Sequence, residues 1–85
     1  MVFSVWFSYE DDEVELEDLS NDTTVSAIRK MLHEGKIFRF PYGTSQTDLQ
    51  IGKLIDQKFE KFKARNTLGD IQFKLGETLY VRVKK

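Results

Sequence analysis

Residues 67–81, TLGDIQFKLGETLYV, contain the most informative pattern of the chain. The first part is typical of a capped turn, and Leu75-Gly76 favours a chain reversal because glycine adopts positive φ without a Cβ clash. From position 78 apolar and polar residues alternate, as in a half-buried strand. The side chains expected to point inward are Leu79, Val81 and Val83, and those expected to point outward are Tyr80 and Arg82. The stretch therefore predicts a turn followed by a strand.

The N-terminal part predicts a hairpin. Residues 2–9 (VFSVWFSY) alternate as a strand, with Phe3, Val5, Phe7 and Tyr9 on one face and Trp6 on the other. Residues 10–13 (EDDE) suit a charged turn, and residues 13–19 (EVELEDL) alternate again. Two such strands joined by a short polar loop form a hairpin.

A helix and a short strand are expected next. Asp22, Thr23 or Thr24 can accept hydrogen bonds from the first free N–H groups of a helix. The apolar residues that recur on one helical face are Val25, Ile28, Met31 and Leu32. Gly35 suits a left-handed residue that ends the helix. Residues 36–40 (KIFRF) read as a strand that Pro41 ends.

Residues 44–66 allow two interpretations. A helical arc joins Ile51, Leu54, Ile55, Phe59 and Phe62 and favours an amphipathic helix over about residues 48–64. Gly52 opposes this helix because glycine in a helix interior costs about 1 kcal/mol. It could instead mark a turn between two short strands, residues 48–51 and 53–55.

The order of elements resembles the β-grasp fold of ubiquitin and its relatives. The resemblance is strongest in residues 67–81, in the pattern T-L-x-D followed by T-L at the start of the last strand, and Gly35 matches the glycine after ubiquitin's helix. It implies an α+β fold in which a mixed sheet packs on one main helix. The first strand would be central, beside the second and last strands. The face under the helix would carry Phe3, Val5, Phe7, Val14, Leu16, Leu79, Val81 and Val83.

The resemblance also implies a partner-binding surface, because ubiquitin-like domains commonly bind partners on the opposite face of the sheet. The expected partner-binding residues there are Trp6, Glu15, Glu17, Tyr80 and Arg82. Tryptophan is a frequent hot-spot residue, and the carboxylates would favour a basic or aromatic peptide. Arg82 occupies a position that is aliphatic in ubiquitin's patch, so receptors of an aliphatic patch are not expected. Alternatively, residues 44–66 fold over Trp6 and cover it.

Conjugated modifiers of this fold use a flexible tail that ends in Gly-Gly. The chain ends VRVKK directly after the predicted strand, so we expect a non-enzymatic interaction domain rather than a conjugated modifier. A resemblance to the small ubiquitin-like proteins of bacterial type VII secretion operons suggests the role of an accessory subunit.

Length and composition are those of one domain, residues 1–85. The net charge of −1 hides an asymmetry. Residues 1–34 carry nine acids and two bases, a charge of about −7, whereas residues 35–85 carry eleven bases and five acids, about +6. The chain has no cysteine, no signal peptide and no apolar run of membrane-spanning length, so we expect a cytoplasmic protein without membrane contact.

No catalytic or metal motif is found. His33 is the one histidine, and the residues from Asp18 lack the glycine and glutamate that an EF-hand requires at its sixth and twelfth positions. We therefore expect no enzyme activity, no cofactor and no metal. The alternative function is nucleic-acid binding by the basic stretch 53–65, through Lys58, Lys61, Lys63 and Arg65. The acidic N-terminal half makes nucleic acid an unfavourable partner.

Overall fold

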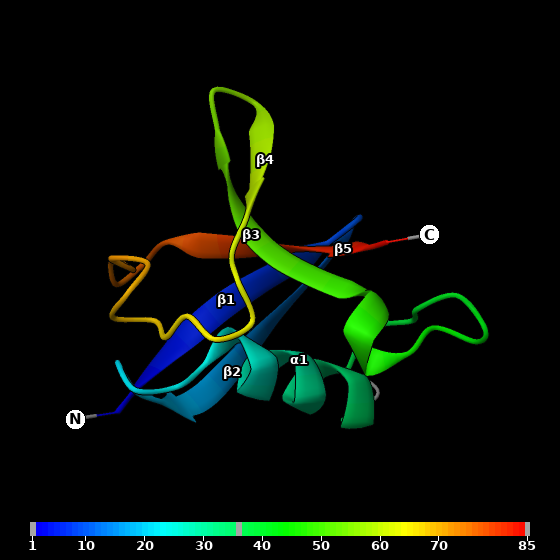
Figure 1. The fold of residues 1–85 in the computed structure, drawn as a ribbon, viewed down its shortest axis with the longest axis horizontal. Coiled ribbons are helices and arrows are strands. Elements are labelled where there is room, and N and C mark those ends of the chain that lie inside the picture. The colour runs from blue at the N-terminus through cyan, green and yellow to red at the C-terminus, as the bar shows by residue number, and fades with distance from the viewer. Residues whose placement is uncertain (1, 36, 85) are drawn as a thin grey trace.

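The computed structural model describes residues 2–35 and 37–84 and shows a five-stranded mixed sheet packed on a helix (Figure 1). The strands lie in the order β2-β1-β5-β3-β4. The elements are β1 (Phe3–Tyr9), β2 (Asp12–Leu19), α1 (Val25–Glu34), the 3-10 helix η1 (Gln46–Asp48), β3 (Leu49–Ile55), β4 (Lys58–Lys61) and β5 (Thr78–Val83). The expected α+β class is confirmed.

Strand β1 is central, as expected. It pairs antiparallel with β2 and parallel with β5, so the first and last strands of the chain lie side by side in the sheet. The alternation predicted for β1 and β5 is confirmed, since Val5, Phe7, Leu79 and Val81 are buried under α1. This face of the sheet is called the inner face below. The other face is called the outer face.

Strand β2 contains a bulge that simple alternation does not predict. Val5 pairs with Leu16, but Phe3 pairs with Leu19, so one extra residue is inserted in β2. Asp18 lies there with φ of 62°, a left-handed conformation that aspartate tolerates better than most residues. The bulge turns Leu19 into the core, where it is fully buried.

Helix α1 begins as the sequence predicts. Thr24 is the N-cap, and its hydroxyl accepts the backbone N–H of Ala27 at 3.1 Å. Two further N–H groups of the first turn, those of Val25 and Ser26, donate to the carbonyls of Asn66 and Ala64 at 2.8 and 2.9 Å. The segment that follows β4 is therefore fastened to the start of the helix.

The end of α1 differs from expectation. Gly35 has φ of −73°, so the prediction of a left-handed residue is wrong. Glycine is required for space instead, because a Cβ at this position would lie 2.8 Å from the Met31 carbonyl oxygen and 3.1 Å from Ile37. Met31 itself is 41% exposed and not part of the buried face, which consists of Val25, Ile28 and Leu32.

The strand predicted over residues 36–40 is wrong. Lys36 lies outside the described residues, and Ile37 to Phe40 form no strand. Their aromatic rings pack on the end of β1 instead: the Tyr9 ring centroid lies 5.7 Å from that of Phe38 and 4.9 Å from that of Phe40. The apolar residues of this segment therefore pack as a loop against the core and do not form hydrogen bonds with a neighbouring strand.

The helix predicted over residues 48–64 is also wrong, because this region forms the β3–β4 hairpin, which projects from the sheet away from α1 (Figure 1). Asp56 and Gln57 connect the strands with φ of 51° and 67°, as in a two-residue type I′ turn. The alternative prediction, a turn at Gly52 between two short strands, is wrong too. Gly52 lies within β3, where a Cβ would approach the Glu60 carbonyl oxygen to 2.1 Å.

The approach to β5 follows the sequence prediction. Thr67 and Asp70 cap their turn reciprocally: the Thr67 N–H donates to the Asp70 carboxylate at 3.0 Å, and the Asp70 N–H donates to the Thr67 hydroxyl at 3.1 Å. Gly76 has φ of 89°, as expected for the reversal.

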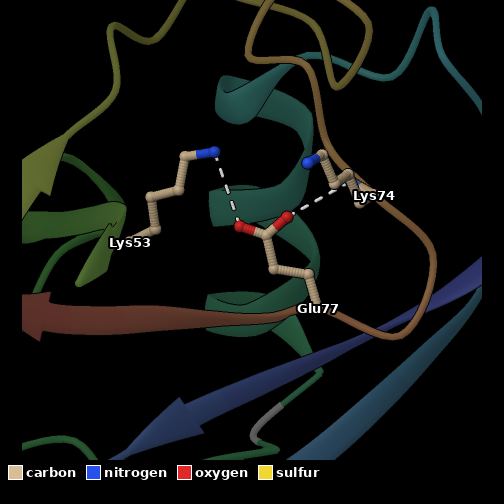
Figure 2. Close-up of polar contacts among 3 residues, drawn as sticks. All are labelled: Lys53, Lys74 and Glu77. Atoms are coloured by element: carbon tan, nitrogen blue, oxygen red, sulfur yellow. Dashed lines mark hydrogen bonds and ion pairs between the residues drawn. The ribbon is translucent and has the colours of Figure 1, made fainter. Parts of the chain in front are cut away.

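Glu77 joins this reversal to the hairpin. Figure 2 shows its carboxylate between Lys74, whose backbone N–H donates to it at 3.2 Å, and the Lys53 ammonium at 3.4 Å. Lys53 belongs to β3, so the ion pair ties that strand to the turn that enters β5.

Candidate functional site

The outer face of the sheet places Trp6 in an open position. Trp6 is 44% exposed and lies between Glu15 of β2 and Thr78 of β5 in the strand register. Residues 44–66 do not cover it, because they form η1 and the hairpin on the far side of β5. A large aromatic ring in the central strand is thus left half in water.

The two predicted carboxylates lie on the exposed edge strand. Glu15 is opposite Trp6, and its Oε2 accepts the hydroxyl of Ser4 at 2.7 Å. This hydrogen bond holds the carboxylate against β1. Glu17 is exposed two residues further along β2, next to the bulge. Trp6 is therefore bordered by negative charge on the β2 side.

The predicted β5 residues lie on the other side of Trp6, against the hairpin. Tyr80 pairs with Ser8 of β1 and Gly52 of β3 and is partly buried. The Arg82 guanidinium carbon lies 4.9 Å from the centroid of the Phe59 ring, within cation–π range. The positive charge of Arg82 is thus held in place by stacking.

An open hollow of about 370 Å³ lies beside these residues. Its lining includes Tyr80, Arg82, Leu54, Phe59 and Glu10. Leu54 is 48% exposed and pairs with Phe59 across the hairpin. The outer face thus continues from Trp6 into an apolar hollow that has charged groups of both signs.

Sequence reasoning missed Leu54 and Phe59 because it assigned them to the buried arc of a helix. Strand parity from Gln50 would have placed Leu54 on the face of Tyr80 and Arg82, since alternate residues of a strand share a face. The hairpin could have been predicted from residues 54–59, LIDQKF, where the two turn residues Asp56 and Gln57 separate two short strands that contain apolar residues. Asp-Gln is a weaker hairpin signal than Asn-Gly.

The residues of the nucleic-acid alternative do not form one basic stripe. Lys58 and Lys61 lie in β4 at positions that face opposite sides, and Lys63 and Arg65 follow in the segment that leads to α1. The helix that would have aligned them is absent. Lys61 and Lys63 instead line a separate pocket, described below.

His33 has a structural contact. Its Nε2–H donates to the Thr44 backbone carbonyl at 2.9 Å and so fastens the 37–44 loop to the end of α1. In the described part of the chain no three His, Asp or Glu side chains are placed to share a metal ion.

Burial and the nearby Glu10 carboxylate raise the pKa of Tyr9 above its usual value, which keeps that phenol neutral.

These strands, their order and the helix across them are the ubiquitin-like β-grasp fold, and solved structures agree. Caldiarchaeum subterraneum ubiquitin aligns with a TM-score of 0.69 and 15% identity over 100% of this chain and 96% of that one. The UBL domain of Plasmodium falciparum Dsk2 aligns with a TM-score of 0.68 and 21% identity over 95% and 96%. AtBAG1, solved in complex with HSP70, aligns with a TM-score of 0.70 and 16% identity over 96% of this chain and 40% of that one.

A curated relative is also similar in sequence. Myosin heavy chain kinase B of Dictyostelium discoideum is 75% identical over 95 aligned residues, which include 100% of this chain and 13% of the kinase. The chain thus spans a small part of that protein's length. No family model matches the chain. Among residues 2–35 and 37–84, no helix combines the length and the apolar character that crossing a membrane requires.

Proposed function

We propose that the chain, residues 1–85, is a non-enzymatic protein-interaction domain whose binding site is the outer face of the sheet. The observation that carries the proposal is the 44% exposure of Trp6 in a central strand. Exposing a large aromatic ring to water is unfavourable, and tryptophan is enriched among residues that dominate binding energy. A partner that covers Trp6 would recover that free energy.

The surroundings of Trp6 indicate the chemistry of the partner. Glu15 and Glu17 lie on the β2 side of the ring. On the β5 side the register partner of Trp6 is Thr78, with Tyr80 two residues and the stacked Arg82 four residues further along that strand. A peptide with a basic group near β2 and an aromatic or apolar group over the hollow would be complementary to both sides. An aliphatic-patch receptor is a poor fit, because it would have to desolvate Arg82.

The kinase activity in the name of the relative belongs to that protein. For this chain we propose binding and not phosphoryl transfer, in line with the absence of a glycine-rich phosphate loop in its sequence. A role as an accessory subunit and a cytoplasmic location remain predictions.

The test compares three immobilised forms of the chain: wild type, Trp6→Ala and Leu75→Ala. Leu75 is 70% exposed in the turn before β5, so its variant also removes an exposed apolar side chain, but away from the outer face. Quantitative mass spectrometry of captured proteins should show partners that Trp6→Ala loses and Leu75→Ala retains. Equal recovery by all three forms contradicts the site.

Fluorescence gives an independent readout, since Trp6 is the one tryptophan. In the isolated chain iodide should quench Trp6, and a bound partner peptide should protect it and shift its emission to the blue. A spectrum already blue-shifted and resistant to iodide in the free monomer would show that the ring is covered, and the proposal would fail.

A further inference from the structure

A second site lies away from Trp6, in a pocket of about 300 Å³ lined by residues of α1, β3 and the end of β4. Its lining includes four basic residues, Arg29, Lys61, Lys63 and Lys84, and contains no acidic residue. Arg29, the pair Lys61 and Lys63, and Lys84 come from three distant parts of the sequence, and the fold brings them together. They are called the basic pocket below.

Arg29 has unused hydrogen-bonding capacity in this pocket. Its Nη1 donates to the Leu49 carbonyl at 3.3 Å, a long hydrogen bond. Its Nε is buried and has no hydrogen-bond partner, the one such side-chain atom among residues 2–35 and 37–84. Buried donors are normally paired, and a guanidinium presents several N–H groups in a fork that matches oxyanions. Because the Nε is closed to solvent, an anion in the pocket would pair with it only after a movement of the Arg29 side chain.

The basic pocket is also not neutralised by the protein. In the described residues the Lys53–Glu77 contact is the one ion pair, so no carboxylate oxygen lies within 4.0 Å of the charged groups of Arg29, Lys61 or Lys63. Lys84 contributes least, because its charge also acts on Asp48. Three cations around one small pocket repel each other, and a bound anion would relieve that repulsion.

The walls of the pocket are held by backbone hydrogen bonds. The N–H of Phe62 donates to the Ile51 carbonyl at 2.8 Å, and the Ala64 carbonyl accepts the Ser26 N–H at 2.9 Å. Lys61 and Lys63 therefore stand on a segment fastened to β3 on one side and to α1 on the other. The backbone of the site is therefore fixed before binding, and only the exposed lysine side chains have to be ordered.

We propose that the basic pocket binds a phosphate group of a small, multiply charged ligand. Arginine binds phosphate oxygens through its fork and lysine acts as a point charge, and this combination is usual at phosphate sites. A volume of about 300 Å³ is at the small end for ligand pockets, enough for one or two phosphate groups and not for a drug-sized molecule. The site is independent of the proposed interaction function.

The test is titration of the chain with inorganic pyrophosphate and, separately, inorganic phosphate at low ionic strength, followed by calorimetry and by amide chemical shifts. Wild type should bind one pyrophosphate, with shifts at residues 29 and 61–64. Lys61→Gln and Lys63→Gln should each weaken binding about two- to fivefold, as expected for one exposed charge contact. Arg29→Lys, which keeps the charge but removes the fork, should also weaken it.

Lys58→Gln is the matched control. Lys58 is exposed in β4, like Lys61, but does not line the pocket. Its variant should bind pyrophosphate like wild type, and so should Trp6→Ala, which separates this site from the outer face. Equal weakening by Lys58→Gln and Lys61→Gln would show a diffuse surface effect and overturn the proposal, as would the absence of binding.

A single-stranded DNA homopolymer is the second probe. If it binds and Lys58→Gln or Arg65→Gln weakens it as much as Lys63→Gln does, the basic residues act as an extended nucleic-acid surface, and the small-ligand proposal is wrong. The proposal is supported if the homopolymer does not bind. It is also supported if the homopolymer binds, pyrophosphate displaces it, and only the pocket variants weaken its binding.

Discussion

The two faces of the sheet are made by the same strands and have opposite character. On β1, Phe7 is fully buried on the inner face, while its neighbour Trp6 is 44% exposed on the outer face. On β5, Leu79 and Val81 are buried, and Tyr80 and Arg82 face outward. Helix α1 covers one face, and no described element covers Trp6 on the other. The inner face forms the core of the fold, and the outer face, which leaves Trp6 in contact with water, is the one proposed for binding.

The largest expected change in the free energy of unfolding comes from a substitution on the inner face. Phe7→Ala should lower the free energy of unfolding by about 3–5 kcal/mol, because it leaves a large cavity in the core. Urea denaturation followed by circular dichroism measures the change. Trp6→Ala, the adjacent residue on the outer face, should cost much less. If both variants lose the same stability, Trp6 is a packed residue and the contrast between the faces is wrong.

The next effect on stability concerns the close approach of β3 and β4 at Gly52. Gly52→Ala should lower the free energy of unfolding by about 1–3 kcal/mol, because the new Cβ would lie 2.1 Å from the Glu60 carbonyl oxygen and the hairpin must shift. Gln50→Ala, on the same strand and face, is the control and should change it by less than about 0.5 kcal/mol. Wild-type stability in Gly52→Ala would mean that β3 and β4 are less close than the structure shows.

The smallest effect is on the pH dependence of stability and concerns the loop before β3. The Ser45 N–H donates to the Asp48 carboxylate at 3.0 Å and lowers the pKa of that carboxyl below its usual value. A lowered folded-state pKa adds stability above the unfolded-state value, and this contribution disappears as the pH falls through the folded-state pKa. The stability difference between wild type and Asp48→Asn should therefore shrink below about pH 4. A constant difference from pH 7 to pH 3 would contradict this linkage.

Prediction from sequence succeeded where the pattern was local. Thr24 caps α1, Gly76 takes positive φ, and the alternation of β1 and β5 assigns their faces correctly. Prediction failed in residues 37–64, and in residues 48–64 both a helix and a hairpin were compatible with the sequence. The spacing of Ile51, Leu54 and Phe59 suits one face of a helix, but in the hairpin Ile51 is buried and Leu54 is exposed on the opposite face of β3. Pairing with β5 and the close approach at Gly52 resolve the ambiguity, and both are long-range contacts.

The alternation of residues alone determined which side of the sheet carries Trp6, Tyr80 and Arg82, because it depends on periodicity within a few residues. The α+β class and the central position of the first strand followed from the resemblance of the sequence to ubiquitin and its relatives. Only the tertiary structure decided that Trp6 is uncovered, that Phe59 stacks on Arg82, and that Arg29, Lys61 and Lys63 share a pocket. The physical reason is distance along the chain. Residues separated by tens of positions meet only when the sheet and the helix have packed, and no local pattern encodes that meeting.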